Sequence, residues 1–364
     1  MNAENIIFLS LFFVLVAAEW TYTKWKNLKY FDLSDSLMNI YTGVVGFVGS
    51  LLFTPLLYGL LDFLYQFAVV RYEPSPAAWC AVFLFVDFVG YWHHRLSHRI
   101  NFLWAAHVVH HQSEYYNLTV GIRTSIFTPL TQMVFYAALP LVGFDPALIT
   151  SIFIFSGILQ LLVHTEHIRK LGVWEHILVT PSAHRVHHGQ NDVYLDKNYG
   201  VVLILWDKLF GTYEPEIDKV QYGITSQSAH QNPVYVTFFY FRQIVSTAAT
   251  LKGMDKIRVF FLPPAWAAEA KIKNENPSNL LTGSLKNSNT LIAAYCVFQL
   301  VASYLILLYS IFTLHPFLMT NESVANMIIA CVASSALLEG RIWGSFLELI
   351  RWISFFFLLI SFYF

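Results

Sequence analysis

Apolar runs separated by short polar stretches fill most of the chain. They cover residues 6–20, 37–65, 77–92, 126–144, 147–163, 291–314, 324–338 and 345–364. A helix needs about 20 apolar residues to cross a bilayer, so the longer runs predict spanning helices. In the second run, Gly43, Gly46 and Gly49 are spaced for close helix packing. The pattern predicts an all-α, multi-pass integral membrane protein.

Polar stretches divide the chain into four predicted parts. Residues 1–76 hold N-terminal transmembrane helices, and residues 77–214 form a membrane-embedded core. Residues 215–290 are polar and predict a cytosolic flap or linker, and residues 291–364 predict C-terminal transmembrane helices. Within the core, residues 143–146 (Gly-Phe-Asp-Pro) predict a turn that returns the chain to the side of the membrane that it left.

The composition agrees with a lipid environment. The chain has 364 residues, of which 56% are hydrophobic and 12% charged, whereas soluble domains carry roughly 25% charged residues. The net charge of -1 argues against nucleic acid as a partner, because phosphate binding needs a basic surface. The three cysteines lie far apart and suggest neither a disulfide framework nor a zinc finger.

Three short histidine motifs carry the strongest chemical signal. They read H-R-L-S-H at 94–98, H-V-V-H-H at 107–111 and H-R-V-H-H at 184–188, and they hold eight of the fourteen histidines. A spacing of three or four residues stacks the imidazoles on one helix face. Imidazole suits zinc, copper, iron and nickel, and eight nitrogens exceed what one tetrahedral zinc site uses. The motifs therefore predict two metal ions with positions left open for dioxygen or water.

The predicted metal ligands are the eight motif histidines and one more that follows the fifth apolar run. They are His94, His98, His107, His110, His111, His164, His184, His187 and His188. The histidines outside these motifs favour other roles. His93, His167 and His176 are expected to be structural, and His230 and His315 are expected to be bystanders.

A carboxylate is expected to support the histidines. Metal-bound histidine usually donates its second ring N–H to a carboxylate or a carbonyl group. Asp87 lies two helical turns before His94 inside an apolar run, where a carboxylate is costly unless it is paired. We therefore expect Asp87 to support the site, with Glu114 and Glu166 as weaker candidates for the same role.

Charges near the apolar runs predict the orientation of the chain. Lys24, Lys26 and Lys29 follow the first run, and basic residues favour the cytosolic side. Counting crossings from a lumenal N-terminus places the acceptor sequence Asn-Glu-Ser at 321–323 in the lumen, where it can be glycosylated. The same count places all three histidine motifs on the cytosolic side.

The motifs and their surroundings resemble a known superfamily. The similar stretches are DFVGYWHHRLSH (87–98), AAHVVHHQSEYYN (105–117), VHTEHI (163–168), TPSAHRVHHG (180–189) and DKNYGVVLILWDKLFGTYE (196–214). The eight histidines resemble the signature of the fatty acid hydroxylase and sterol desaturase superfamily. The residues around them resemble its branch of tetrahydrobiopterin-dependent glyceryl-ether monooxygenases. Ala183 departs from the pattern, because the family usually has another histidine at this position.

The resemblance implies a specific chemistry for the core at 77–214. Two iron ions would be held by the eight motif histidines. With O2 and tetrahydrobiopterin, the enzyme would hydroxylate the ether-linked carbon of an alkylglycerol or a lyso-alkylglycerophospholipid, giving a fatty aldehyde and glycerol or its derivative. Asp87 and Glu114 are then candidate catalytic residues, and Glu114, Tyr116 and Asn117 are hypothetical pterin contacts. The protein would lie among the lipids of the endoplasmic reticulum membrane with its histidines facing the cytosol.

Two other functions are compatible with the histidine motifs. The first is a sterol or fatty acyl hydroxylase or desaturase that receives electrons from a cytochrome. The second is a non-catalytic zinc or iron transporter, which predicts histidines distributed along several spans at bilayer depth. An enzyme predicts instead that they gather at one membrane face.

Overall fold

The computed structural model of the chain describes residues 3–224, 232–267, 290–312 and 321–363. Every regular element in these ranges is a helix, apart from an isolated bridge between Leu178 and Leu203. The all-α prediction is therefore confirmed for the described residues. The chain forms two compact units: a terminal unit and a histidine unit. The terminal unit comprises Met1–Val45, Ser228–Val236 and Leu281–Phe364, and the histidine unit comprises Gly46–Gln227 and Thr237–Leu280.

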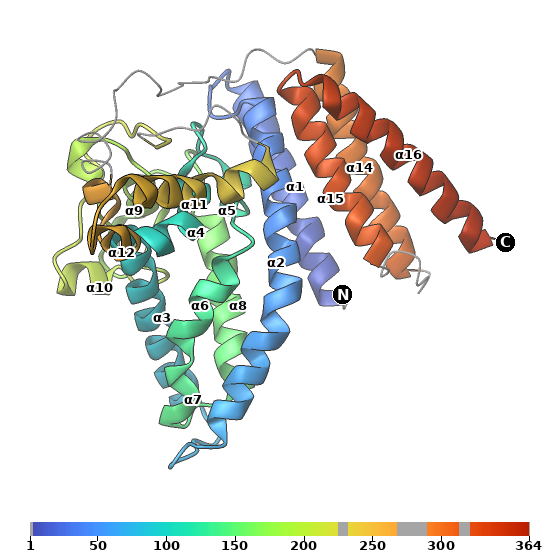
Figure 1. The fold of residues 1–364 in the computed structure, drawn as a ribbon. Coiled ribbons are helices and arrows are strands. Elements are labelled where there is room, and N and C mark those ends of the chain that lie inside the picture. The colour runs from blue at the N-terminus through green and yellow to red at the C-terminus, as the bar shows by residue number, and fades with distance from the viewer. Residues whose placement is uncertain (1–2, 225–231, 268–289, 313–320, 364) are drawn as a thin grey trace. The chain divides into compact units, whose positions relative to one another are not determined.

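Apolar helices form the frame of the histidine unit. They are most of α2 (Leu33–Tyr65), α3 (Pro76–Arg99), the short pair α6 (Thr128–Tyr136) and α7 (Ala138–Val142), and α8 (Pro146–Leu162). Helix α3 packs against both α6 and α8 (Figure 1). One hydrophobic cluster joins these helices, and its buried members are Leu61, Val82, Val86, Tyr136, Leu139, Phe144, Leu148, Ile149 and Ile152.

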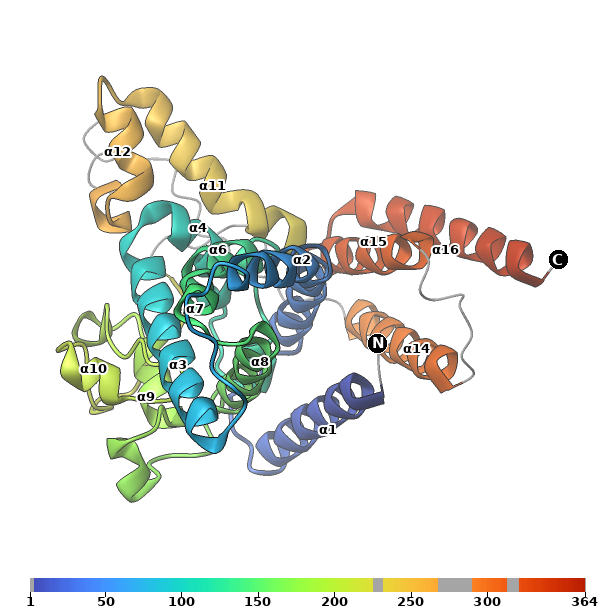
Figure 2. The ribbon, with the colours of Figure 1, turned by 90° about the horizontal axis from the view of Figure 1, so that it is seen from below.

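The described part of the histidine unit also contains two 3-10 helices and further α-helices, among them most of α11. They are α4 (Asn101–His111), α5 (Leu118–Gly121), η1 (Gly172–His176), α9 (Pro181–His187), η2 (Asp192–Tyr194), α10 (Leu205–Leu209), α11 (Pro233–Thr250) and α12 (Asp255–Phe261). Figures 1 and 2 show α11 and α12 lying crosswise to α8. The Asn101 side chain donates to the Val259 carbonyl at 2.7 Å and thereby ties α4 to α12.

The predicted turn at 143–146 is confirmed. Gly143 ends α7 with a φ of +109°, and a Cβ there would lie 2.1 Å from the Val70 carbonyl oxygen, so only glycine fits. Asp145 then caps α8 by accepting from the backbone N–H groups of Ala147 and Leu148. The apolar run at 126–144 is two helices rather than one. Pro140 is the physical reason, because its ring clashes with the carbonyl group four residues earlier.

Glycines of α2 allow another chain segment to approach closely. A Cβ on Gly46 would lie 2.3 Å from the Thr124 side chain, and a Cβ on Gly49 would lie 2.3 Å from the Ile126 carbonyl oxygen. The expected close packing is therefore present at these two positions, although the neighbour is the loop before α6 rather than another helix.

The terminal unit contains α1 (Ala3–Trp25), the start of α2, α14 (Thr290–Phe312), α15 (Asn321–Leu338) and α16 (Ile342–Tyr363). A buried ion pair between Glu348 and Arg351 lies among the last three helices. Gln299 of α14 donates to Glu348 at 2.6 Å, and Arg351 donates to Asn326 of α15 at 3.3 Å. Each of these polar groups is satisfied across a helix interface, as apolar surroundings require.

Apolar side chains also cover the outside of the histidine unit. Trp79 and Phe85 on α3, and Ile154 and Phe155 on α8, are all exposed. Among the described helices, Leu33–Tyr65 is long and apolar enough to cross a membrane, and four shorter apolar helices accompany it. These features fit membrane association. The number of crossings and the division at 76, 214 and 290 remain predictions.

Candidate metal centre

A corner between two helices positions the first two histidine motifs. Helix α3 ends at Arg99, and Ile100 is extended before α4 begins at Asn101. His94 and His98 lie one turn apart near the end of α3. The last five residues of α4 carry the next three histidines, His107, His110 and His111. The corner folds the two helices back on each other and brings both motifs to the same place.

The other four predicted ligands lie on or directly after α9 and directly after α8. Thr180 caps α9 by accepting from the Ala183 N–H, and Pro181 occupies the first turn, where it needs no hydrogen-bond acceptor. This short helix carries the third motif. His164 is buried and directly follows Val163, the C-cap residue of α8.

The nine predicted ligands form two groups. The first contains His94, His98, His107, His111 and His187, and the second contains His110, His164, His184 and His188. Within each group the candidate ligand atoms lie within 4.8 Å of one another. The groups touch, because the rings of His111 and His188 stack with centres 4.4 Å apart. Each group can hold a metal ion.

Ring nitrogens in these groups face each other in a way that favours a shared cation. The Nδ1 atoms of His110 and His164 lie 3.0 Å and 2.7 Å from the carbonyl oxygens of Arg123 and Gln160. A carbonyl oxygen only accepts, so each Nδ1 carries the proton and each Nε2 presents a lone pair. These two Nε2 atoms are 3.2 Å apart. Two lone pairs cannot hydrogen bond, but they can share a cation.

The spacing fits metal coordination. Metal–nitrogen bonds of about 2.0–2.1 Å put neighbouring ligand atoms about 2.9–3.4 Å apart. His94 and His107 have Nε2 atoms 3.1 Å apart, and His164 and His184 have theirs 3.0 Å apart. Further ring nitrogens are buried without a hydrogen-bond partner, namely His98 Nε2, His184 Nδ1, His187 Nε2 and His188 Nε2. The residues present therefore fit two metal ions.

Burial keeps the rings neutral, as metal ligation requires. Desolvation lowers the pKa of His110 to about 4 and that of His187 to about 3. For both rings, a hydrogen bond to a backbone carbonyl only partly opposes this effect. At neutral pH both rings are uncharged and can donate a lone pair.

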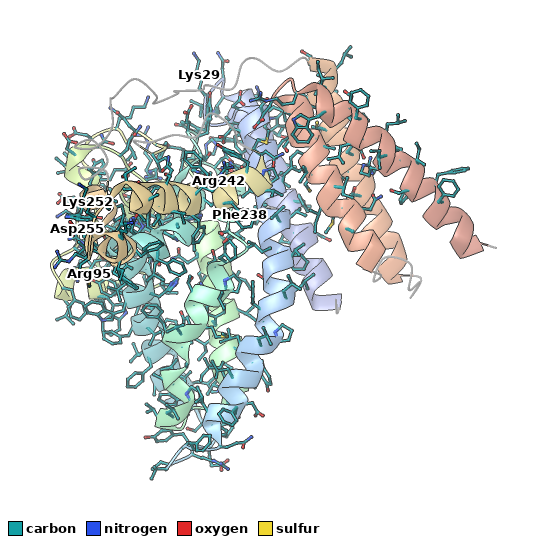
Figure 3. All side chains as sticks on the ribbon, in the orientation of Figure 1. Lys29, Arg95, Phe238, Arg242, Lys252 and Asp255 are labelled. Atoms are coloured by element: carbon teal, nitrogen blue, oxygen red, sulfur yellow. The ribbon has the colours of Figure 1, made fainter. Side chains whose placement is uncertain are left out.

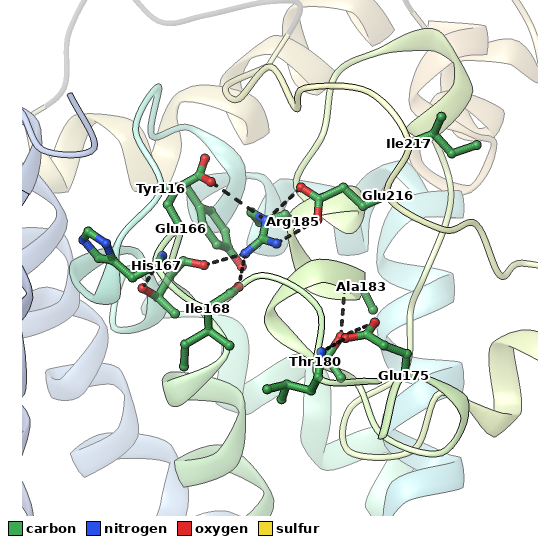
Figure 4. A network of polar contacts seen from close by, with 12 residues as sticks. Tyr116, Glu166, His167, Ile168, Glu175, Thr180, Ala183, Arg185, Glu216 and Ile217 are labelled. Atoms are coloured by element: carbon green, nitrogen blue, oxygen red, sulfur yellow. Dashed lines mark hydrogen bonds and ion pairs between the residues drawn. The ribbon is translucent and has the colours of Figure 1, made fainter. Parts of the chain in front are cut away.

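A buried arginine holds the second group together (Figure 4). Arg185 lies between two ligands of α9 and donates to the backbone carbonyls of Thr165 and Ile168 at 2.8 Å and 2.7 Å. It also makes two hydrogen bonds to the Glu216 carboxylate, at 2.9 Å and 2.7 Å. The Glu216 carboxylate raises the pKa of Arg185 despite the opposing effect of burial. The segment that follows His164 is thereby fixed to α9.

Asp87 was expected to support the site, and its carboxylate bonds to the segment 202–206 rather than to a histidine ring. Its carboxylate accepts from the backbone N–H groups of Val202 and Leu203 and from the Trp206 indole. The Nδ1 atom of His94 bonds instead to the Tyr199 carbonyl at 2.9 Å. These three donors satisfy the buried Asp87 carboxylate, and the Tyr199 carbonyl of the same segment satisfies Nδ1 of His94.

The predicted pterin contacts differ in their surroundings. The Asn117 side chain is buried and caps α5 by accepting from the backbone N–H and the hydroxyl group of Thr119. The Tyr116 ring is buried and stacks on Tyr222, with ring centres 4.9 Å apart. Among the three, only Glu114 exposes its side chain to solvent.

The remaining histidines lie outside both groups where the structure describes them. His93 is buried, with its Nε2 atom 3.2 Å from the Thr131 hydroxyl group, and His167 and His176 belong to neither group. Desolvation lowers the pKa of His167. His230 and His315 fall outside the described residues.

One basic and one acidic residue near the centre, Arg185 and Asp207, were not predicted from the sequence. Arg185 lies inside the third motif. Its position between two predicted ligands was the sequence signal that could have identified it. Asp207 is fully buried and accepts from the backbone N–H groups of Tyr199 and Gly200. Its only sequence signal was a charged residue within an apolar run.

Known proteins are similar to the segment that holds this centre. Residues 79–212 match the fatty acid hydroxylase family, and this segment contains all nine grouped histidines. The segment of the chain that holds both histidine groups is therefore similar to the fatty acid hydroxylase family.

The chain is also similar to alkylglycerol monooxygenases. It is 38% identical to the Homo sapiens enzyme over 265 residues, which are 71% of this chain and 58% of the relative. It is 33% identical to the Danio rerio enzyme, over 73% of this chain and 59% of the relative. The Xenopus tropicalis enzyme is 41% identical over 53% of this chain and 43% of the relative. The chain thus spans less than two thirds of the length of these relatives. No solved structure matches it significantly.

Proposed function

We propose that the chain is a membrane-bound di-iron monooxygenase that uses O2 and tetrahydrobiopterin to hydroxylate the ether-linked carbon of alkylglycerols. The hydroxylated ether is a hemiacetal, which collapses to a fatty aldehyde and glycerol or its derivative. The observation that carries the proposal is the pair of adjacent histidine groups with facing lone pairs. The similarity to enzymes named alkylglycerol monooxygenase supports the choice of an ether lipid.

Each histidine group would hold one iron ion. Two iron ions held by these imidazoles would supply the oxidant that hydroxylation of the C–H bond beside the ether oxygen requires. The chain contributes by fixing the rings. Nδ1 of His94 donates to the Tyr199 carbonyl oxygen. Nδ1 of His110 donates to the Arg123 carbonyl oxygen, and Nδ1 of His164 to that of Gln160. Each Nε2 is thereby left to bind metal. Such partners usually raise ligand basicity and fix the tautomer.

The location of the histidines favours an enzyme over a transporter. All nine come from the C-terminal end of α3, from α4, from the residue after the α8 cap and from α9. A transport path would instead distribute them along the length of the spans. This gathering at one end of the histidine unit is what catalysis on a lipid at a membrane face requires.

The proposed membrane is that of the endoplasmic reticulum, with the histidines facing the cytosol. Figure 3 shows Arg95, Arg242 and Lys252 at the end of the histidine unit that carries α4 and α12. Basic residues favour the cytosolic side of a membrane, so their position supports this orientation. The exposed apolar faces of α3 and α8 would then contact lipid.

The pterin proposal concerns Glu114 most directly, because the Tyr116 and Asn117 side chains are buried in internal contacts. We expect Glu114→Gln to raise the KM for tetrahydrobiopterin with little change in the KM for the lipid. Glu73→Gln, a change at another exposed glutamate, is the control. Equal KM values for the pterin in both variants would remove Glu114 from the pterin site.

The decisive experiment uses the full chain, purified in detergent and loaded with ferrous iron. One reaction contains an alkylglycerol with tetrahydrobiopterin and O2, and the other a sterol or a fatty acyl substrate with a reduced cytochrome and O2. We expect fatty aldehyde in the first reaction and no product in the second. Product in the second reaction alone would overturn the proposal in favour of the cytochrome-dependent alternative.

A further inference from the structure

Both polar groups of the peptide between Tyr199 and Gly200, the carbonyl and the N–H, make hydrogen bonds to side chains. Its carbonyl oxygen lies 2.9 Å from Nδ1 of His94, and its N–H donates to the Asp207 carboxylate at 2.7 Å. A hydrogen bond on one side of an amide polarises the amide and strengthens the bond on the other side. His94 and Asp207 are therefore coupled through a single peptide group, although their side chains do not touch.

The donors around Asp207 favour its ionised form. Three groups donate to it, each at 2.7 Å: the N–H of Tyr199, the N–H of Gly200 and the hydroxyl of Thr212. The side chain is fully buried, and burial raises its pKa, whereas these three hydrogen bonds oppose that rise. An ionised carboxylate only accepts hydrogen bonds, so these three donors match the ionised form of Asp207.

Two hydroxyl groups connect Asp207 to the Arg95 guanidinium through a series of hydrogen bonds. The hydroxyl proton of Thr212 points to Asp207, so Thr212 accepts from the Tyr91 hydroxyl group, 3.0 Å away. Tyr91 in turn accepts from the Arg95 guanidinium at 3.0 Å. Every proton in this series points from the cation toward the carboxylate. The charge of Arg95, which Figure 3 labels on α3, thus supports the negative charge of Asp207.

The local backbone is shaped for this contact. A Cβ on Gly200 would lie 2.9 Å from Oδ2 of Asp207 and 2.7 Å from the Leu203 carbonyl oxygen, so a larger residue would push the carboxylate away. The backbone carbonyl of Asp207 accepts from the N–H groups of Thr212 and Tyr213, which fixes the residue from a second side. Only glycine permits this approach.

We infer that Asp207 is a positioning residue for the metal centre, acting on His94 through the Tyr199–Gly200 peptide. The carboxylate holds the carbonyl oxygen in place, which keeps the proton of His94 on Nδ1 and makes Nε2 a stronger ligand. This inference rests on the proposed two-metal function. It concerns the first histidine group alone, because His110 and His164 of the second group bond to the Arg123 and Gln160 carbonyls instead.

The inference is tested by metal binding. The full chain in detergent is loaded with ferrous iron or with cobalt(II), and each ion is withdrawn by titration with a chelator. Loss of a histidine partner of this kind typically weakens metal affinity by about 10- to 100-fold. In Asp207→Asn we expect one of the two ions to be bound that much more weakly and the other as in the wild type. The cobalt absorption of the weakened ion should shift as well.

Matched variants separate positioning from folding. Asp192→Asn changes an exposed aspartate and should bind both ions as the wild type does. Thr212→Val removes one donor to Asp207, whereas Thr212→Ser keeps it, so we expect weaker binding of one ion in the valine variant alone. If Asp207→Asn does not fold, equal metal binding in the two Thr212 variants would overturn the inference.

The outcomes distinguish the inference from the proposed function. A folded Asp207→Asn protein that holds both ions with wild-type affinity and an unchanged cobalt spectrum would overturn the role of Asp207 and leave the proposed function intact. A wild-type protein that binds neither iron nor cobalt would overturn both.

Discussion

Replacing Arg185 with methionine should destabilise the histidine unit and release the metal of the second group. The guanidinium is buried, with 3% of its side chain exposed, and it bonds to the carbonyls of Thr165 and Ile168 and to the Glu216 carboxylate. Methionine keeps an unbranched side chain but removes all these donors. The segment after His164 and helix α9 then lose the contact that fixes one to the other.

The magnitude follows from the surroundings of the ion pair. Removing one partner of a buried pair costs about 3–5 kcal/mol, because a charge is left without compensation. The Glu216 side chain is 20% exposed, so water partly compensates it and we expect about 2–4 kcal/mol. In a unit of 150–250 residues, each kcal/mol lowers the unfolding temperature by about 2–4 °C. The expected fall in Tm is on the order of 5–15 °C.

The assay compares this variant with Arg99→Met. Arg99 pairs with Asp196 at 2.9 Å, but 49% and 42% of the two side chains are exposed, so the loss should be below about 1 kcal/mol. Thermal unfolding of the metal-free proteins in detergent, followed by circular dichroism, gives both Tm values. Metal analysis after loading should find one ion lost in Arg185→Met and none in Arg99→Met.

Two results would contradict the reasoning about Arg185. A Tm for Arg185→Met as high as that of Arg99→Met would mean that the network adds no stability. A lower Tm with both ions retained would mean that Arg185 stabilises the fold without holding the second histidine group.

Three further predictions follow from the described contacts. His110→Ala should abolish turnover and lower the metal content, whereas His167→Ala should leave turnover near the wild-type rate; activity retained in His110→Ala would contradict the two-metal interpretation. Gly49→Ala should destabilise the protein by about 1–3 kcal/mol, because its Cβ would lie 2.3 Å from the Ile126 carbonyl oxygen; chemical unfolding measures this, and an unchanged free energy of unfolding would refute it. The metal-free protein should lose stability as the pH falls from about 6.5 to about 4. The pKa values of His110 and His187 are lowered to about 4 and about 3 in the folded state, so in this window the unfolded chain binds more protons. A Tm that does not change between pH 7 and pH 4 would exclude this linkage.

The histidine spacing predicted the arrangement of the centre because it depends on local helix geometry. Residues three or four apart share a helix face whatever the fold, so His94 with His98, and His107 with His111, meet as expected. His164 was predictable for a similar reason, since it directly follows an apolar run. The gathering of three separate motifs followed from their shared chemistry, because isolated buried imidazoles are unfavourable.

The supporting residues could not be predicted in the same way, because their contacts join distant parts of the chain. Asp87 lies on the expected helix, but its partners Val202, Leu203 and Trp206 come from a segment whose position the spacing does not encode. Asn117 follows a histidine motif in the sequence and caps a helix in the structure. The break between α6 and α7 was different, since Pro140 is itself a sequence signal for it.

The two histidine groups also differ in how early a ribosome makes most of their members. Four residues of the first group lie between His94 and His111, on two consecutive helices, and only His187 comes later. The second group joins His110 to His164, His184 and His188, so it requires three well-separated segments to have been made and folded. Contacts close in sequence form faster than distant ones. Four members of the first group can therefore meet while the second group has only His110, although both groups are complete within one residue of each other, at His187 and His188.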